Sequence, residues 1–276
     1  MIDFCHIAPT KHLDLVKGRP AHLVLAHLIE EDEKYVDFYK EETGTIIMDN
    51  SAFEMYKQGK PMLSSDKLID LANKLGNVDY IVMTDYPDEP FMKTVNAAKK
   101  LAPEFKAAGY GTFFCPQANI GDLESLIKSF VWACNNPDLV DYVGISILNI
   151  PNAYNVERGN KLQRFSARLR FMYTLQMIGV LDKFKMHKQK IHMLGMVDGP
   201  NEILFMKPFH DHISTWDSSA AIWAGLNHIR FDNSPTGLRD GKYEKEVDFD
   251  VEFVDIESIR AATTNMYYID GLCKDA

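Results

Sequence analysis

The sequence predicts a single-domain (β/α)8 TIM barrel, an α/β fold, and two observations lead to this class. Eight short apolar runs recur along the 276 residues, and patterns typical of amphipathic helices separate them. Continuous apolar runs are typical of strands that are buried on both faces of a parallel sheet. Strand–helix alternation over this length favours one barrel over residues 1–276. A doubly wound open sheet is the alternative, but the chain carries no Gly-x-Gly-x-x-Gly or Walker A motif.

The predicted elements follow one another without a linker rich in Pro, Gly or Ser. In chain order, the strand candidates are residues 23–25, 45–48, 80–83, 112–114, 142–145, 191–194, 213–216 and 229–231. Ser64, Ser65 and Asp66 are N-cap candidates for a helix that ends before Gly76. The other helix candidates are residues 93–108, 123–134, 161–181 and 257–272.

Composition excludes several classes of protein. The 30 Lys and Arg oppose 39 Asp and Glu, and the net charge of −9 argues against a small basic DNA-binding module. No apolar run reaches the roughly 18 residues that span a bilayer, so we expect no membrane partner. Residues 1–6 do not resemble a signal peptide, and the four cysteines form no Cys-x-x-Cys pair, so we expect a cytoplasmic protein.

Carboxylates follow three of the predicted strands. Asp49, Asp85 and Asp217 each stand at a strand end, and Gln117 follows another strand. Because barrel enzymes place their active sites at the C-terminal ends of the strands, we expect these side chains to share one mouth. Like charges in one pocket raise some pKa values, which suits one carboxyl to proton transfer and another to nucleophilic attack. Each Asp is also compatible with an ordinary helix cap or turn.

Six motifs in the same order resemble the tRNA-guanine transglycosylase superfamily over about residues 20–235. Residues 47–54, Ile-Met-Asp-Asn-Ser-Ala-Phe-Glu, resemble its Asp-Ser-Gly-Gly-Phe-Gln signature, and residues 80–85 resemble its next strand, which ends in a base-binding Asp. Gln117 stands where the family has its base-binding Gln. Residues 143–146, 192–196 and 216–218 resemble the later strands, the last of which holds the family's nucleophile.

The resemblance implies base exchange by double displacement at C1′ of a nucleotide. Asp217 would be the nucleophile and Asp49 the general base. The residues that the resemblance places around the base are Asn50, Phe53, Asp85, Gln117, Gly144, Ile145, Leu194, Gly195 and Met196. The implied partners are a 7-deazaguanine base and DNA or tRNA, from which the nucleotide would be flipped out. A homodimer is one of the oligomeric states that the sequence leaves open.

The chain departs from the family in ways that bear on zinc and on the base. The family's tRNA enzymes carry a zinc site of three Cys and one His near the C-terminus, where this chain has only Cys273, so we expect no metal and no cofactor. Ala52 and Glu54 replace a Gly and the Gln of the signature, which puts guanine selectivity in question. Compact zinc-free relatives modify DNA in bacteriophages, and this chain resembles those more, which would place it in the host's cytoplasm.

Positive charge is concentrated in one segment. Residues 156–190 hold nine Lys and Arg against two acidic residues, whereas much of the negative charge lies in the acidic C-terminal segment, about residues 240–276. Since the segment follows the fifth predicted strand, we expect phosphate contacts beside the mouth. The residues expected to make them are Arg158, Lys161, Arg164 and Arg168. A solvated helix face is the alternative.

Two other functions compete with base exchange. One is a non-catalytic nucleic-acid-binding relative of the same barrel, which would have no need of both Asp49 and Asp217. The other is a carboxylate-dependent nucleoside or glycoside hydrolase, which would have no need of the basic segment.

Overall fold

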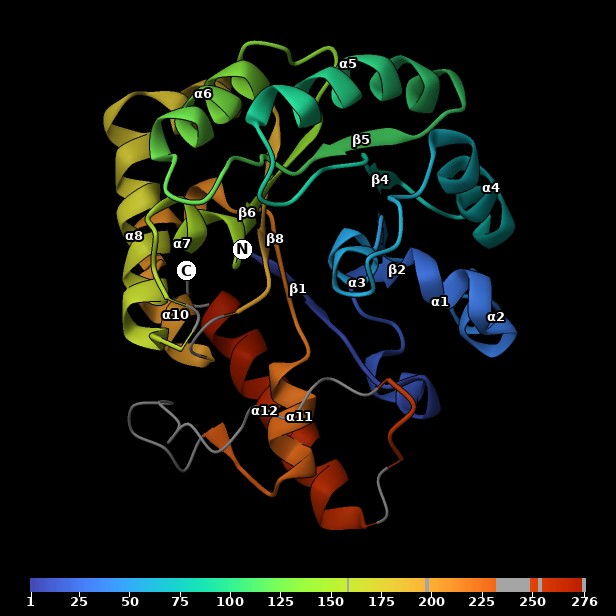
Figure 1. Ribbon diagram of the computed structural model, residues 1–276. Helices are drawn as coiled ribbons and strands as arrows, with labels where there is room; N and C mark the ends of the chain where they lie inside the picture. Colours follow the sequence, from blue (N-terminus) through green and yellow to red (C-terminus); the bar gives the residue numbers. More distant parts are fainter. Residues whose placement is uncertain (158, 197–198, 232–248, 253–254, 275–276) are drawn as a thin grey trace.

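Eight parallel strands form the centre of the computed structural model, and helices surround them (Figure 1). The structure describes residues 1–157, 159–196, 199–231, 249–252 and 255–274. The strands are β1 (Asp3–His6), β2 (Ala21–Leu25), β3 (Thr45–Asp49), β4 (Tyr80–Val82), β5 (Gly111–Phe114), β6 (Tyr142–Ser146), β7 (Lys190–Leu194) and β8 (Thr215–Ser218). Their hydrogen-bonded order is β1-β8-β7-β6-β5-β4-β3-β2, and β1 also packs beside β2. The sheet therefore curls into a nearly closed (β/α)8 barrel in a single domain, as predicted.

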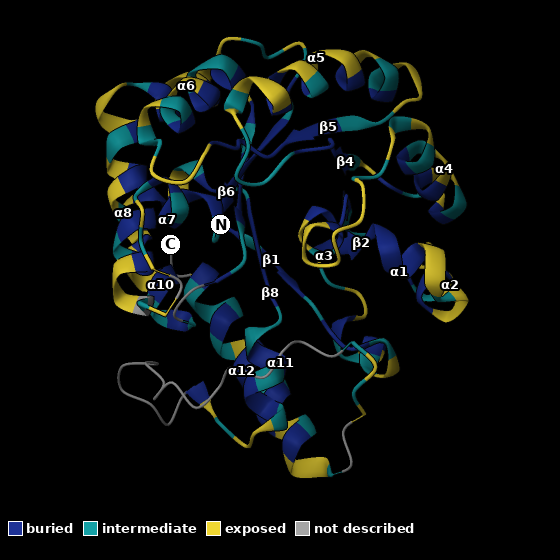
Figure 2. Ribbon diagram, in the orientation of Figure 1, coloured by how far each residue is buried: buried dark blue, intermediate teal, exposed yellow. Residues whose placement is uncertain are grey.

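Helices follow the strands and surround the barrel. They are α1 (Ala26–Glu31), α2 (Glu33–Lys40), α3 (Ala52–Lys57), α4 (Ser65–Leu75), α5 (Phe91–Ala107), α6 (Leu123–Cys134), α7 (Asn149–Ala153), α8 (Lys161–Met177), α9 (Val180–Met186), α10 (Pro200–Phe205), α11 (Ala220–Leu226) and α12 (Ile256–Lys274), with 3-10 turns at Thr10–Val16 and Lys207–His212. Of these, α3 lies at the mouth of the barrel (Figure 1). The strands are buried, whereas the helices expose their outer faces (Figure 2). None of the described helices is long and apolar enough to cross a membrane.

Alternate residues of each strand face the barrel interior, as the two-residue period of a strand requires. The interior-facing apolar side chains include Cys5, Leu23, Ile47, Val82, Phe113 and Tyr142. The residues between them, such as Val143 and Ile145 of β6, pack outward in the main core beneath the helices. The same alternation of inward and outward side chains continues to the strand ends. Asp49 of β3 and Asp217 of β8 therefore face inward at the mouth.

The number of strands was predicted correctly, but two assignments were wrong. Asp3–His6 forms β1, which pairs with β8, although its mixed polar and apolar residues form no continuous apolar run. Residues 229–231 do not form a strand, because their backbone bonds to helices instead. The Ile229 amide donates to the Ala224 carbonyl at 2.9 Å, and the Phe231 amide donates to Asn265 Oδ1 of α12 at 2.7 Å.

Four predicted helices match closely and a fifth is divided. The helix predicted over residues 257–272 is α12 (Ile256–Lys274). Ser64 caps α4 by accepting from the Lys67 amide, and α5 and α6 lie where their apolar periodicity placed them. The single helix predicted over residues 161–181 is wrong, because Gly179 adopts a left-handed conformation (φ 72°) that separates α8 from α9. The acidic segment predicted over residues 240–276 ends in α12, and its part within residues 232–248 lies outside the described residues.

Replacing Gly225 by Ala should destabilise the protein. A Cβ atom at Gly225 would lie 2.3 Å from the Ala262 amide nitrogen, so α11 and α12 would have to move apart. We expect a loss of about 1–3 kcal/mol in the free energy of unfolding, measured by chemical denaturation. Gly271→Ala in α12 is the matched control, since a Cβ there meets no atom within 4 Å. Equal stability of the two variants would contradict the close helix contact.

Candidate active site

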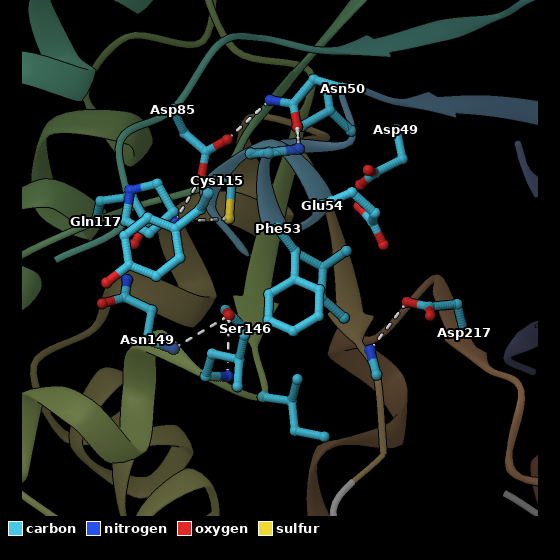
Figure 3. A pocket seen from close by; sticks show the side chains of 18 of the residues that line it. Asp49, Asn50, Phe53, Glu54, Asp85, Cys115, Gln117, Ser146, Asn149 and Asp217 are labelled. Atoms are coloured by element: carbon cyan, nitrogen blue, oxygen red, sulfur yellow. Dashed lines mark hydrogen bonds between the residues drawn. The ribbon is translucent and has the colours of Figure 1, made fainter. Parts of the chain in front are cut away.

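A cavity of about 410 Å³ opens at the C-terminal ends of the strands (Figure 3). Strand ends, the loops that follow them and α3 form its wall. Its lining includes the carboxyl groups of Asp49, Glu54, Asp85, Asp88 and Asp217, together with Asn50, Phe53, Cys115, Gln117, Ser146, Asn149, Leu194 and Gly195. The three carboxylates predicted from the strand ends therefore share one pocket with the predicted Gln.

Asp217 of β8 is held by two donors from β7 and the residue after it. Its Oδ1 lies 2.8 Å from His192 Nε2 and accepts from the Gly195 amide at 3.0 Å. Among the described residues both hydrogen bonds fall on Oδ1, so Oδ2 is the oxygen open to a ligand. The two donors fix the orientation of the Asp217 carboxyl group, which suits it to a nucleophilic role.

Gly195 is fixed from both sides. It has a left-handed backbone (φ 68°), and a Cβ there would lie 2.9 Å from Ile147 Cγ2. While its amide donates to Asp217, its carbonyl accepts from Trp216 Nε1 at 2.8 Å and from Arg168 Nη1 at 3.1 Å. These contacts determine the position of the amide that holds Asp217.

Asp85 forms the centre of a second polar group, on the far side of the cavity from Asp217 (Figure 3). Asn50 Nδ2 donates to Asp85 Oδ1 at 2.8 Å, and Gln117 Nε2 donates to Oδ2. Burial raises the pKa of Asp85, while the two amide donors oppose that rise. Asn50 also donates to the Met83 carbonyl at 2.8 Å, so the group is oriented before any ligand arrives.

Asp49 lies at the end of β3, where the chain turns into α3. Its Oδ1 accepts from the Ser51 amide at 2.7 Å, and Ser51 takes a left-handed conformation (φ 56°) that directs the chain into α3. Loss of solvent raises the pKa of Asp49 well above its ordinary value, and the charge of nearby Glu54 raises it further. Asp49 is thus biased toward its protonated form, the state that a proton donor needs.

The structure places most of the predicted base-binding residues in the cavity wall, but not all of them. Asn50, Phe53, Asp85, Gln117, Leu194 and Gly195 line it. Ile145 and Met196 do not, which corrects the prediction: both belong to the core between strands and helices. Gly144 lies deeper in the barrel, where a Cβ would come within 2.6 Å of Leu194 Cδ1.

The prediction that Arg164 and Arg168 contact phosphate is wrong. Arg164 is 5% exposed, and its Nη2 donates to the Ile147 carbonyl at 2.8 Å. Arg168 is completely buried, forms a 2.8 Å ion pair with Glu202 and donates to the Ile145 carbonyl. Both face the barrel from α8, because their four-residue spacing puts them on one helix face and that face packs inward. Arg158 and the side chain of Lys161 lie outside the described residues.

Four described lysines of the basic segment also lie away from the mouth. Lys183, Lys185 and Lys188 precede β7, and Lys190 is its first residue, so they are at the N-terminal end of that strand. The cavity is at the opposite, C-terminal end. The sequence correctly shows a local excess of positive charge, but α8 carries the chain from one end of the barrel to the other within the segment.

His192 is the functional candidate that the sequence did not assign to the site. It is completely buried on β7, and its ring joins Asp217 to Thr215. The sequence signal for His192 was a polar residue at a position of an apolar strand whose side chain faces the barrel interior. Cys115 also lines the cavity, where burial and then the charge of Asp85 raise its thiol pKa. Among the described residues no group of three or more His, Cys, Asp and Glu could hold a metal ion.

Comparison with known proteins finds similar architectures only. No family model and no curated protein matches the chain. A dihydrodipicolinate synthetase candidate from Pseudomonas aeruginosa is 13% identical, with a TM-score of 0.45, and the match covers 100% of this chain and 99% of the other. CbXyn10B is 10% identical, with a TM-score of 0.40 and coverage of 95% and 96%. At these identities and TM-scores neither structure indicates what this pocket binds.

Asp49→Asn should stabilise the protein above neutral pH. Because the folded-state pKa of Asp49 is raised, the wild type loses stability as pH rises from the ordinary carboxyl pKa through the folded-state pKa. The Asn side chain keeps an acceptor for the Ser51 amide but carries no charge. We expect a gain of about 1–2 kcal/mol at pH 8 and little change at pH 4, measured by urea denaturation.

Exposed Asp138 provides the control for this comparison. Asp138→Asn should leave the stability difference between pH 4 and pH 8 as it is in the wild type. If Asp49→Asn also left the stability difference between pH 4 and pH 8 unchanged, the raised folded-state pKa of Asp49 would be contradicted.

Proposed function

We propose that the protein is a guanine transglycosylase, which exchanges guanine in DNA for a 7-deazaguanine base by double displacement at C1′. The observation that carries this proposal is that two carboxyl groups in one cavity, Asp217 and Asp49, have different hydrogen bonds and different electrostatic surroundings. Asp217 receives two hydrogen bonds on Oδ1, whereas burial and Glu54 bias Asp49 toward its protonated form. Cleavage of an N-glycosidic bond needs one anion to meet the developing positive charge and one acid to protonate the leaving base.

The first displacement would use both groups. A lone pair on Asp217 Oδ2 attacks C1′, and the bond between C1′ and N9 of guanine breaks with its electrons remaining on N9. The Asp49 carboxyl gives its proton to the base as the bond breaks. Guanine leaves as the neutral base, Asp49 becomes a carboxylate, and the sugar is held to Asp217 as an ester.

The second displacement would restore the site. The ring N–H of the incoming base gives its proton to the Asp49 carboxylate, and the ring nitrogen attacks C1′. The bond between C1′ and Asp217 Oδ2 breaks, so Asp217 is again an anion and Asp49 is again protonated. No atom or proton is gained or lost over the cycle, and no cofactor is required.

The second polar group suits the edge of a guanine-like base. Asp85 accepts hydrogen bonds, and Gln117 presents a carbonyl oxygen beside it while its amide is engaged with Asp85. N1–H and the 2-amino group of guanine are neighbouring donors, and these two side chains would accept from them. Since Asp85 and Asn50 are oriented in advance, the base would not have to order them on binding.

A nucleoside hydrolase is the second candidate, and one observation favours it. Arg164 and Arg168 are buried, and the described lysines of residues 183–190 lie at the opposite end of the barrel from the cavity. The predicted phosphate contacts beside the mouth therefore have less support than the predicted contacts of the cavity residues with a base. In a hydrolase, water would replace the incoming base in the second step.

One assay separates these functions. The protein is incubated with a labelled 7-deazaguanine in three separate reactions, which contain DNA, tRNA or free guanosine. Incorporation of label into DNA supports the proposal. Incorporation into tRNA alone would show that the polymer substrate is tRNA and not DNA. Release of guanine from guanosine without incorporation would indicate the hydrolase. Binding of polymer with neither reaction would indicate a non-catalytic binder and overturn the proposal.

Asp217→Ala should abolish base exchange. The variant lacks the atom that bonds to C1′, so we expect a loss of at least about 1000-fold in kcat. Asp138→Asn, an exposed carboxylate away from the cavity, is the control and should retain full activity. Full activity of Asp217→Ala would remove Asp217 as the nucleophile.

Salt provides an independent measurement. If a polymer is bound through phosphates, the affinity should fall steeply as salt rises from about 50 to 200 mM. A flat response would favour a small substrate over DNA or tRNA.

A further inference from the structure

A chain of buried polar side chains runs from the cavity into the centre of the barrel. His192 Nε2 lies 2.8 Å from Asp217 Oδ1, His192 Nδ1 lies 2.6 Å from Thr215 Oγ1, and Thr215 Oγ1 lies 3.3 Å from the Tyr142 hydroxyl. His192 is completely buried, Tyr142 is 1% exposed and Thr215 is 3% exposed. Polar groups this deep are costly unless each is hydrogen-bonded, so the chain's donors and acceptors must match.

Matching them leaves one arrangement when Asp217 is an anion and the ring is neutral. A carboxylate only accepts, so His192 must carry its proton on Nε2 and donate to Oδ1. Nδ1 is then an acceptor and takes the Thr215 hydroxyl proton. Thr215 Oγ1 in turn accepts from the Tyr142 hydroxyl. All three protons point toward Asp217.

The arrangement reverses if Asp217 is protonated. The carboxyl would donate to Nε2, Nδ1–H would donate to Thr215, and the Thr215 hydroxyl would donate to Tyr142. The tautomer of a ring that lies inside the barrel is therefore linked to the protonation state of a carboxyl in the cavity.

Titratable groups from α8, β1 and β3 surround this chain. Arg168 of α8 carries a positive charge behind Gly195 and interacts favourably with Asp217. On β1, Cys5 faces the same interior, and burial together with the charge of Asp217 raises its thiol pKa, so the thiol adds no second negative charge. Asp49 of β3 is biased toward its neutral form. The Phe113 ring meets the His192 imidazole edge-on, with the ring centroids 5.5 Å apart.

We propose that His192 is a positioning residue for Asp217, held in its Nε2–H tautomer by Thr215 and Tyr142. This role rests on the proposed function. It does not require the ring to touch the substrate or to lose a proton. When Oδ2 bonds to C1′, Oδ1 becomes the ester carbonyl oxygen and still accepts from Nε2–H. When the ester breaks, the same hydrogen bond meets the returning charge.

Substitution of His192 separates positioning from packing. His192→Phe fills the space without a donor, whereas the amide of His192→Gln reaches toward Asp217 and cannot titrate. We expect kcat for base exchange to fall about 10- to 100-fold in His192→Phe, the kinetic equivalent of one hydrogen bond to a charged group. His192→Gln should recover most of that loss, while KM for the free base changes little in both. Thr215→Val, which leaves Nδ1 without its partner, should lower kcat in the same direction.

His210→Gln is the matched control, since His210 is also buried but bonds to the Ile203 carbonyl away from the cavity. It should leave kcat unchanged, and thermal melts establish which variants fold. Full kcat in His192→Phe, or equal losses in the Gln and Phe variants, would overturn the positioning role.

A readout without activity decides the tautomer. Nitrogen-15 NMR of the labelled histidine rings, with His192 assigned by comparison with His192→Gln, should show a proton on Nε2 at neutral pH. Asp217→Ala should move that signal and leave the His210 signal in place. A proton on Nδ1 alone in the wild type would overturn the inference even if exchange is observed. If the wild type exchanges no base, the proposed function fails, and the NMR result still decides how the chain is oriented.

Discussion

The Asp217 carboxyl group, placed where solvent is largely excluded, is the constraint on which much of the structure depends. A carboxylate in such a place needs donors, and β7 supplies them through His192 and the Gly195 amide. The Gly195 peptide in turn needs Trp216 and Arg168 on its carbonyl. Arg168 is itself buried and needs Glu202. The pairing of β7 with β8, the left-handed residue after β7 and the packing of α8 are therefore parts of one electrostatic arrangement.

Different surroundings make chemically different groups from three aspartates in one cavity. Asp217 is hydrogen-bonded to a backbone amide and an imidazole, and Asp85 accepts from two side-chain amides. Asp49 accepts from one backbone amide and lies near the carboxylate of Glu54. A residue type has an ordinary pKa, but burial, nearby charge and hydrogen bonds each move it. In the proposed function, these differences would divide the roles of nucleophile, proton donor and base-binding acceptor among the three aspartates.

The barrel was predictable because burial on both faces makes a strand apolar throughout, and helices capped by residues such as Ser64 have local signals. The failures have equally physical reasons. Asp3–His6 is a strand with polar ends because β8 supplies its partners, whereas residues 229–231 form no strand because the Ile229 and Phe231 amides bond to α11 and α12. In the basic segment, the spacing of Arg164 and Arg168 predicts that they share a helix face. It does not say whether that face meets water or the barrel.

Local sequence determined the alternation of strands and helices, the ends of several helices and the position of Asp49, Asp85 and Asp217 at or near strand ends. Parallel strands bring their C-terminal ends together, so the shared mouth followed from the fold class. Only the tertiary structure decided which charges are exposed, which base-binding candidates reach the cavity and which histidine meets Asp217. Those properties depend on contacts between residues far apart in the chain, such as His192 with Tyr142 through Thr215 and Arg168 with Glu202. No local pattern encodes such pairings, because each partner is selected by the packing of the whole barrel.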